Sequence, residues 1–280
     1  MASTTLGPVT WTARWSLPRS VRAVSRVWLM ALILIAWEVV ARTNRTIFFP
    51  PLSSILAQFG RDWFGSNPLH LFLSDKFWDT ATPSLWRLAR GWALAVAVGV
   101  VGGVLVARVR VIRLMYNPMI RFWMATPKVV LLPVALQIFG ISDSLNIFLI
   151  FFGTVWLIMV NTADGVTGVD PMWLRSAHSL RLSRPMLYWR VMIPAASPQI
   201  LAGMRVSIGV GLILMIISEL YATTAGLGYQ VLQQQETFQY VGMWSAFVLI
   251  ALIGMLLNLV FALVEKRLLR WQRRRGLSDL

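Results

Sequence analysis

The chain has 280 residues, of which 57% are apolar and only 13% charged, and this leaves too little polar surface for a soluble domain. It contains no cysteine, which excludes disulfides, thiolate metal sites and cysteine nucleophiles. A net charge of +15 would suit nucleic-acid binding in a soluble protein, but the basic residues are clustered, and this favours membrane topology as the cause of the charge.

Two charge-free runs are long enough to cross a bilayer. Ser144–Ala163 holds 20 residues and Thr237–Val264 holds 28. About 20 predominantly apolar residues in a helix span the hydrocarbon core. The sequence therefore predicts an all-α membrane protein, and we expect about six transmembrane helices.

Residues 1–26 are predicted to be a basic, cytoplasmic N-terminal segment. A first span over about Val27–Ala41 opens the next segment, 27–82, and we expect it to stay uncleaved because Glu38 and Arg42 follow without a small-residue cleavage pattern. Glu38 is read as an interfacial residue in preference to a substrate ligand.

The rest of segment 27–82 is expected on the outer side of the membrane. Pro50 and Pro51 precede an apolar face formed by Ile55, Leu56, Phe59 and Trp63. This spacing predicts an amphipathic helix that is too short to span and lies on the outer membrane surface.

Residues 83–264 are predicted to form a core of five further spans. Their approximate bounds are Pro83–Ala107, Leu114–Phe139, Leu145–Thr162, Ile200–Tyr221 and Met243–Val264. In the first of these, Gly99, Gly102 and Gly103 predict close helix packing.

Charged residues inside spans usually face protein or a water-filled path. The candidates for a translocation path are Arg121, Pro127 and Lys128 in one span and Ser218 and Glu219 at the outer end of another. For Lys128 a purely structural role is left open as an equal alternative.

Four basic stretches set the predicted orientation. They are Arg14–Arg26, Arg108–Arg113, Arg175–Arg205 and Lys266–Arg275. Six spans would place all four on one side, which the positive-inside rule makes the cytoplasm, so both termini are expected there. The basic tail, residues 265–280, is expected along the inner membrane surface in contact with anionic lipid.

The loop over residues 163–199 is predicted to dock another protein. Asp170 suits a helix N-cap and Pro171 the first helical position. Trp173 and Leu180 would be apolar anchors, and a second short helix is expected over Met186–Val191, ended by Pro194. The predicted docking residues are Asp170, Trp173, Leu174, Arg175, Ser176, Ala177, His178, Leu180, Arg181 and Pro194.

This loop resembles the cytoplasmic EAA loop of binding-protein-dependent ABC importer permeases. The family's pattern would place Glu-Ala-Ala at 175–177, glycine at 181 and Ile-x-Leu-Pro at 191–194. The chain keeps Ala177 and Val191-Met192-Ile193-Pro194, but Arg175 stands at the glutamate position and Arg181 at the glycine position. The phrases TPKVVLLP and SELYATTAGLGY are similar to segments of the nitrate, taurine and sulfonate branch, and the resemblance covers roughly residues 45–272.

The resemblance implies a type I importer permease (MetI-like) core with an extra N-terminal span, in the cell membrane. The chain would be the transmembrane subunit for a small solute, an anion such as sulfonate, taurine or nitrate. The implied partners are two ATPase subunits, a second permease subunit, identical or homologous, and an extracytoplasmic substrate-binding protein. ATP and Mg would be bound by the ATPase, with no cofactor in this chain and no nucleic-acid partner.

The sequence does not predict an enzyme. It lacks the G-x-x-x-x-G-K-[ST] pattern of a P-loop, and its two histidines, His70 and His178, are expected on opposite sides of the membrane, which argues against a metal site or a catalytic triad. The alternative function is an ion-coupled secondary transporter, but internal repeats and paired ionisable groups at mid-membrane are not evident. For Arg175, we expect an acidic residue in the cognate ATPase or a mixed permease pair.

Overall fold

The computed structural model describes residues 19–44, 46–65 and 71–273, and helices make up most of this part of the chain. Two compact units divide the chain, Met1–Ser54 and Ile55–Leu280. Most of the predicted N-terminal segment and the end of the basic tail lie outside the described residues.

The first unit is dominated by helix α1 (Arg19–Asn44), whose 26 residues give a length of about 39 Å. Near its end the Glu38 carboxylate accepts hydrogen bonds from the Ser53 backbone N–H (3.1 Å) and hydroxyl (2.7 Å) and pairs with Arg42. Glu38 thus fastens the returning chain to the end of α1, a structural role for this carboxylate.

Helix α2 (Leu52–Trp63) is the predicted amphipathic helix. Two of the four residues of its apolar face, Ile55 and Trp63, are only 1% exposed. The Trp63 indole N–H donates to the Ser245 hydroxyl at 2.8 Å. Packing buries part of the predicted apolar face, whereas Leu56 is 54% exposed, and the placement of this helix on the outer membrane surface stays a prediction.

Four helices of the described chain are long and apolar enough to cross a membrane. They are α3 (Asp75–Arg108), α6 (Asp143–Thr167), α11 (Tyr240–Leu268) and the continuous stretch Arg184–Tyr221, which ends in α9 (Ile193–Tyr221). They correspond to the second, fourth, sixth and fifth predicted spans and confirm the all-α membrane fold. Helix α3 starts at Asp75, before the predicted start at Pro83, because the Ser74 hydroxyl accepts a hydrogen bond from the Phe77 N–H and caps the helix. Pro83 therefore lies inside the helix.

The predicted third span, Leu114–Phe139, is broken and not straight. Helix α4 (Arg110–Ala125) is followed by a 3₁₀ turn, η2 (Lys128–Leu131), and by α5 (Leu132–Phe139), with a bend of 95°. The break lies at Thr126, which is extended (φ −69°, ψ 128°), as expected for a residue before proline. The bent pair is a fifth candidate span. The count of six would also need α1 and stays a prediction.

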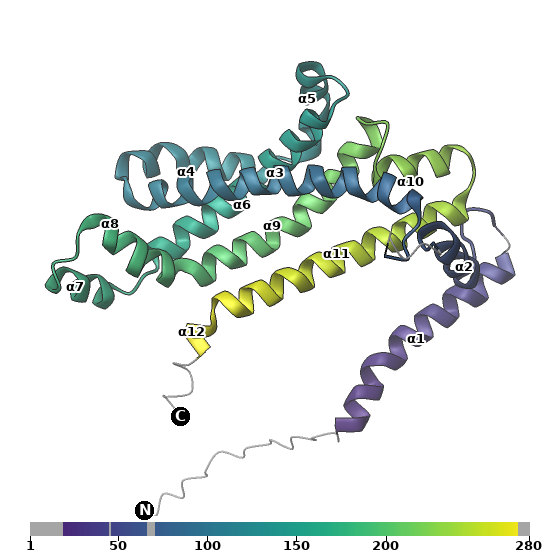
Figure 1. Cartoon of the computed structure of the whole chain (residues 1–280), viewed down its shortest axis with the longest axis horizontal. Coiled ribbons are helices and arrows are strands. Elements are labelled where there is room, and N and C mark those ends of the chain that lie inside the picture. The colour runs from purple at the N-terminus through teal and green to yellow at the C-terminus, as the bar shows by residue number, and fades with distance from the viewer. Residues whose placement is uncertain (1–18, 45, 66–70, 274–280) are drawn as a thin grey trace, which may run out of the picture. The chain divides into compact units, whose positions relative to one another are not determined.

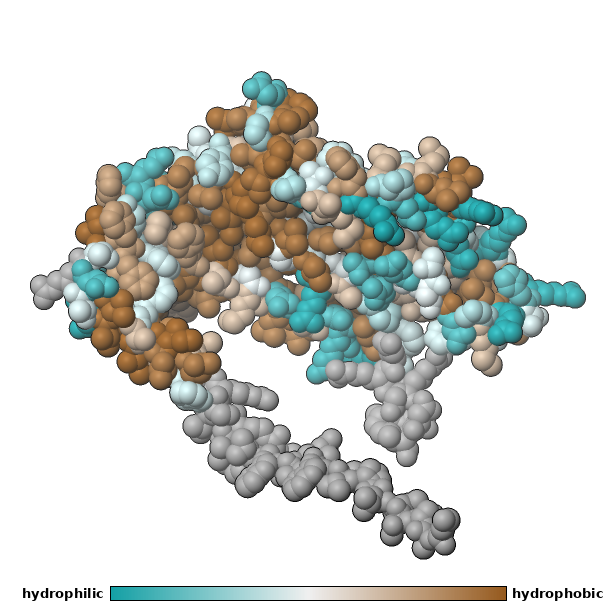
Figure 2. Space-filling view, turned by 180° about the vertical axis from the view of Figure 1, so that it is seen from behind, coloured by the Kyte–Doolittle hydropathy of each residue, from teal (hydrophilic) through white to brown (hydrophobic). Residues whose placement is uncertain are grey.

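The long helices form one bundle, with shorter helices at its two ends. Figure 1 shows α3, α6, α9 and α11 running side by side, with α7 (Pro171–Ser179) and α8 (Arg184–Leu187) at one end and α10 (Leu227–Glu236) at the other. A short turn, α12 (Arg270–Arg273), follows α11. Apolar side chains cover much of the face drawn in Figure 2, and hydrophilic ones gather toward the α7 and α8 end.

Small residues let α3 and α6 approach closely. Gly91, Ala95, Gly99 and Gly103 recur every fourth residue on the α3 face that meets α6. A Cβ atom at Gly103 would lie only 2.5 Å from Thr162 Cβ and 2.6 Å from the Met159 carbonyl oxygen. These distances confirm the close packing predicted from the glycines of α3. Helices in lipid associate through such contacts between small residues.

Candidate functional site

The predicted docking helix is present as α7. The Asp170 carboxylate accepts a hydrogen bond from the Met172 N–H at 2.8 Å and Pro171 occupies the first turn, so the helix starts as the sequence predicted. Ala177 is buried against the bundle, whereas Leu180 is 73% exposed. The helix therefore presents a free face at the end of the bundle.

Helix α7 ends in a Schellman motif. The N–H of Leu182 donates to the Ala177 carbonyl (3.1 Å) and the N–H of Arg181 to the His178 carbonyl (2.9 Å). Arg181 takes the left-handed position of the motif, with φ +49°. Glycine is favoured there because it has no Cβ, which gives a physical reason for the glycine of the resembling family at this position.

The remaining predicted docking residues surround this turn. Trp173 and Leu174 are half-buried, and Arg175, Ser176, His178 and Arg181 are exposed. His178 is turned back on its own helix, with Nδ1 2.7 Å from the Leu174 carbonyl oxygen. Among the described residues, no three His, Cys, Asp or Glu side chains form a group that could hold a metal; His70 lies outside them.

The second helix of the loop differs from the prediction. Pro194 does not end it, because α8, a π-helical turn η3 (Tyr188–Met192) and α9 form one continuous helical stretch, Arg184–Tyr221. The π turn alters the hydrogen-bond register of the stretch directly before α9. Pro194 therefore lies in the first turn of α9, a position where a helix tolerates proline. The docking loop is therefore joined to the far end of the bundle by an unbroken helical stretch.

A groove of about 380 Å³ lies between α7 and the start of this helical stretch. It is lined by Trp173, Ala177, Leu180, Arg190 and Pro194, and also by Trp271 of α12. Part of the C-terminal tail thus lines the same groove as the docking loop, which the sequence did not predict.

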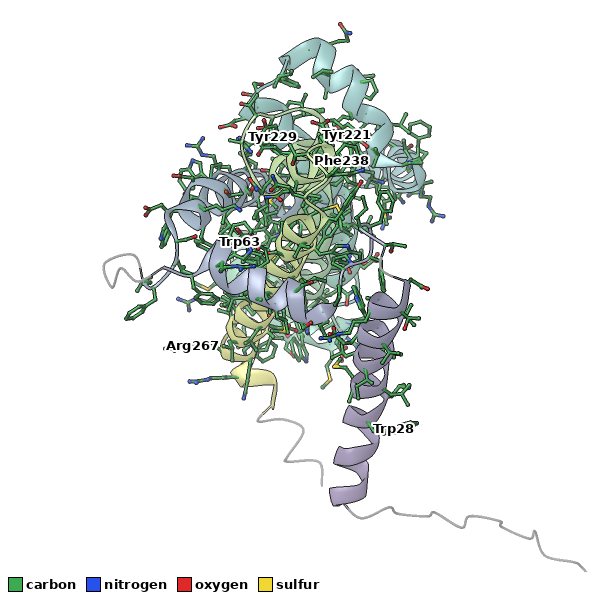
Figure 3. The ribbon with its side chains drawn as sticks, turned by 90° about the vertical axis from the view of Figure 1, so that its right-hand side faces the viewer. Trp28, Trp63, Tyr221, Tyr229, Phe238 and Arg267 are labelled. Carbon is green, nitrogen blue, oxygen red and sulfur yellow. The ribbon has the colours of Figure 1, made fainter. Side chains whose placement is uncertain are left out.

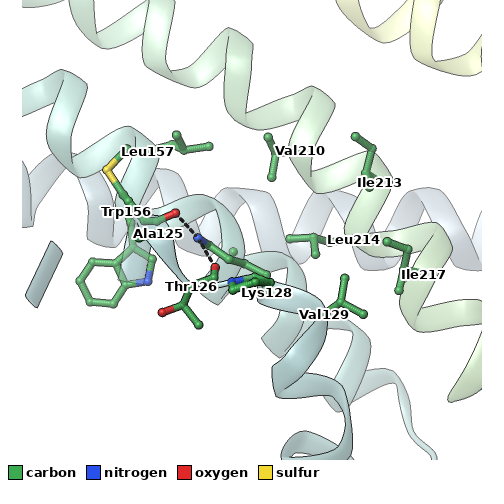
Figure 4. Close-up of a pocket in the computed structure, with 13 residues that line it drawn as sticks. Ala125, Thr126, Lys128, Val129, Trp156, Leu157, Val210, Ile213, Leu214 and Ile217 are labelled. Atoms are coloured by element: carbon green, nitrogen blue, oxygen red, sulfur yellow. Dashed lines mark hydrogen bonds between the residues drawn. The ribbon is translucent and has the colours of Figure 1, made fainter. Parts of the chain in front are cut away.

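The candidate path residues do not share one pocket. Pro127 and Lys128 line a pocket of about 430 Å³ between the α4–η2 bend, α6 and α9, shown in Figure 4. Arg121 lines a different pocket of about 310 Å³ with Asn117 and Asp164.

Glu219 is the centre of a polar network at the α10 end of the bundle. It is fully buried, and its carboxylate pairs with Arg87 at 2.7 Å. It also accepts hydrogen bonds from the Ser84 hydroxyl (2.8 Å) and the Gly228 N–H (3.0 Å). A Cβ at Gly226 would lie 2.6 Å from the carboxylate, so this turn closes tightly on Glu219.

Arg87 extends the network to two further segments. Its Nε donates to Asp143 at the start of α6 (2.7 Å), and one terminal N–H group donates to the Ala225 carbonyl (2.7 Å). The network therefore ties α3, α6, α9 and the turn before α10 together. Sequence reasoning missed Arg87, although an arginine within a predicted span is itself a signal of function or of a buried partner.

Ser218 is fully buried as well, and its hydroxyl donates to the Met215 carbonyl of its own helix. In this conformation neither Ser218 nor Glu219 has exposed surface, so their assignment to a path stays a prediction. Figure 3 looks onto this end, where Tyr221 and Phe238 are exposed by 65% and 70%.

Comparisons with known proteins agree with this architecture. Residues 99–274 match the family described as binding-protein-dependent transport system inner membrane component. The taurine transport system permease protein TauC of Escherichia coli is 28% identical over 260 residues, 92% of this chain and 93% of that protein. The bicarbonate transport system permease protein CmpB of Synechococcus elongatus is 30% identical over 244 residues, 85% of this chain and 86% of that protein.

The fold has also been seen before. A chain from inward-facing structures of the MetNI methionine ABC transporter superposes with a TM-score of 0.60 at 15% identity, over 70% of this chain and 99% of that one. At this identity the likeness concerns the fold alone, and it confirms the MetI-like core that the sequence predicted.

Proposed function

Since the chain belongs to the family of binding-protein-dependent transport system inner membrane components, we propose that it forms half of a path for a small anion through the cell membrane. It is the permease subunit of an ABC importer, a multi-pass membrane protein of a transport family. The ion-coupled transporter considered from the sequence is set aside by this membership.

A separate ATPase would bind the docking loop. The support is structural: α7 has an exposed face at the end of the bundle, with Leu180 as an apolar anchor and Arg175 and Arg181 beside it. ATP and Mg would be held by two copies of that ATPase, which would supply the catalysis, because this chain carries no P-loop sequence.

Movement would pass from the loop to the far end through one helical stretch. Arg184–Tyr221 has 38 residues and a length of about 57 Å, and it ends at Glu219 and the turn before α10. ATP-driven closure of the ATPase pair would draw the docking loops of two permease subunits together and rock these stretches between inward-open and outward-open states.

The substrate class is argued from the relatives. By their names, these transport taurine and bicarbonate, and a Bacillus subtilis protein 25% identical to this chain is a putative aliphatic sulfonate permease. Sulfonates and bicarbonate are small anionic groups, so a small sulfonate or carboxylate-like anion is the proposed cargo. A binding protein would deliver it to the α10 end, which would face outward, with both termini and the docking loop in the cytoplasm.

The match of the family model to residues 99–274, which include the docking loop, carries this proposal. It is tested by purifying the chain in mild detergent from cells that express it with its native partners. A P-loop ATPase that co-purifies, and whose ATP hydrolysis a substrate-binding protein stimulates, is the expected result. Recovery of the chain without any ATPase, in several detergents, would contradict it.

A further inference from the structure

A lysine side chain closes the sharp bend between α4 and η2. The Lys128 ammonium donates hydrogen bonds to the backbone carbonyl oxygens of Trp123, Met124 (2.9 Å) and Thr126 (2.8 Å). Figure 4 draws two of these bonds as dashed lines from Lys128 at the edge of the pocket. All three acceptors belong to the end of α4 or to the residue that follows it.

These carbonyls need a partner because the helix stops here. The last carbonyls of a helix have no N–H group of the next turn to bind. In a continuing helix the Trp123 carbonyl would accept from residue 127, but that residue is Pro127, which has no N–H. The Phe122 carbonyl is already satisfied by the N–H (3.0 Å) and the hydroxyl (2.8 Å) of Thr126.

The ammonium suits this position chemically. It has three N–H donors, and three carbonyls accept from it. A positive charge at a helix C-terminus is also favoured by the helix dipole. In hydrocarbon, where water cannot satisfy the carbonyls, such a cap has more value than it has in water.

The lysine stem lies next to α6. A Cβ atom at Gly153 on α6 would meet Lys128 Cγ at 3.3 Å and Leu214 Cδ1 of α9 at 2.0 Å. The methylene chain therefore lies across the place where α6 passes the bend, while the charged end turns back to α4.

We propose that Lys128 is a positioning residue that holds the bend between α4 and α5, and not a cation that binds the transported anion. Its three donors are already used, so the pocket beside it presents mainly the apolar side chains of Trp156, Val210, Ile213 and Ile217. The angle of the bend, and with it the wall of this pocket, depends on the lysine. The consequence for transport rests on the proposed function, whereas the consequence for the bend does not.

The bend is tested with spin labels, which the cysteine-free chain accepts without a background. Labels go at Met115 on α4 and Ile138 on α5, which are 63% and 68% exposed. In the full importer complex, with the two labels on one permease subunit only, Lys128→Met is expected to replace a single label distance with a broad distribution. Lys128→Arg should retain the single distance, and Lys128→Gln, which keeps two N–H donors, should retain most of it. Arg121→Met, on the same helix, is the control and should leave the distance unchanged.

Uptake kinetics separate the two roles of the lysine. A positioning role predicts that Lys128→Met lowers the maximal uptake rate without raising KM for the anion, and that Lys128→Gln transports better than Lys128→Met. A single label distance in Lys128→Met, or a raised KM that is equal in the Gln and Met variants, would overturn the proposal. If Lys128→Met does not assemble, the KM of the Gln variant decides: an unchanged KM supports the positioning role and a raised KM overturns it. If the unmodified complex takes up no solute, the proposed function fails while the distance measurement still tests the bend.

Discussion

Substitution of Gly103 by alanine is expected to push α3 and α6 apart. The new Cβ would stand 2.5 Å from Thr162 Cβ and 2.6 Å from the Met159 carbonyl oxygen, whereas carbon atoms in contact are normally about 3.5–4.0 Å apart. The carbonyl belongs to the α6 backbone and cannot rotate away. The helices would therefore have to separate by about 1 Å at this point.

The expected loss follows from two opposing terms. Overpacking of this kind costs about 1–3 kcal/mol. The higher helix propensity of alanine returns at most about 1 kcal/mol. The net loss should lie between about 0 and 3 kcal/mol, with a central value of about 1.5 kcal/mol, and it should lower Tm by several degrees, since about 2–4 °C corresponds to 1 kcal/mol in a chain of this size.

The assay is thermal unfolding in detergent, with two alanine variants as controls. Gly209 on α9 has no heavy atom within 4 Å of its added Cβ, so Gly209→Ala should be neutral or stabilising. Gly102→Ala meets the flexible end of Met159 and should cost less than Gly103→Ala. Equal Tm values for Gly103→Ala and Gly209→Ala would refute the close contact of α3 with α6.

Three further predictions concern the charged residues. Breaking the buried Arg87–Glu219 pair by Glu219→Gln should destabilise the chain by up to about 3–5 kcal/mol, and Arg42→Met at the exposed pair in α1 should have a much smaller effect. Additive effects of Arg87→Met and Glu219→Gln in a double-mutant cycle would contradict the pairing. Arg181→Gly should stabilise the end of α7 by about 1 kcal/mol, because glycine removes the strain of the left-handed conformation. Slower hydrogen exchange of the backbone amides in this turn would support this prediction, and faster exchange would contradict it. Arg175→Glu should weaken binding of the cognate ATPase in a pull-down titration if that ATPase carries a compensating acidic residue, and tighter binding would disprove that compensation.

The spans could be predicted because length and apolarity alone decide which segments cross a bilayer. Their ends could not, since helices continue beyond the apolar run when a local cap is available. Helix α3 starts at Asp75, under the Ser74 hydroxyl, although its charge-poor part begins much later. The docking helix was predictable at its start for the same reason, because Asp170 and Pro171 are local signals.

Prolines show where sequence reasoning reaches its limit. Pro127 ends a helix and introduces a 95° bend, whereas Pro83 lies within α3 and Pro194 follows a π turn in a continuous helical stretch. The rule that proline ends or kinks a helix treats these three residues alike. The outcome differs because it depends on which other groups can satisfy the carbonyls that proline leaves without a donor. At the bend, the side chain of Lys128 does so.

The buried network could not be found from spacing. Arg87 and Glu219 are separated by 132 positions and meet only because α3 and α9 pack together. The resemblance of SELYATTAGLGY to related permeases pointed to Glu219 but not to its partner. An unpaired arginine inside a span is costly, so the presence of Arg87 in a predicted span was the available signal. It called for a search for an acidic partner in another span.

Uptake by reconstituted vesicles tests the central claim most directly. The chain is reconstituted with its ATPase, ATP is enclosed on the docking-loop side, and a labelled alkanesulfonate is added outside with the cognate binding protein. An importer permease predicts accumulation that requires ATP, is lost with a hydrolysis-deficient ATPase and persists when the proton gradient is collapsed. Uptake that continues without ATP and disappears with the gradient would contradict the account.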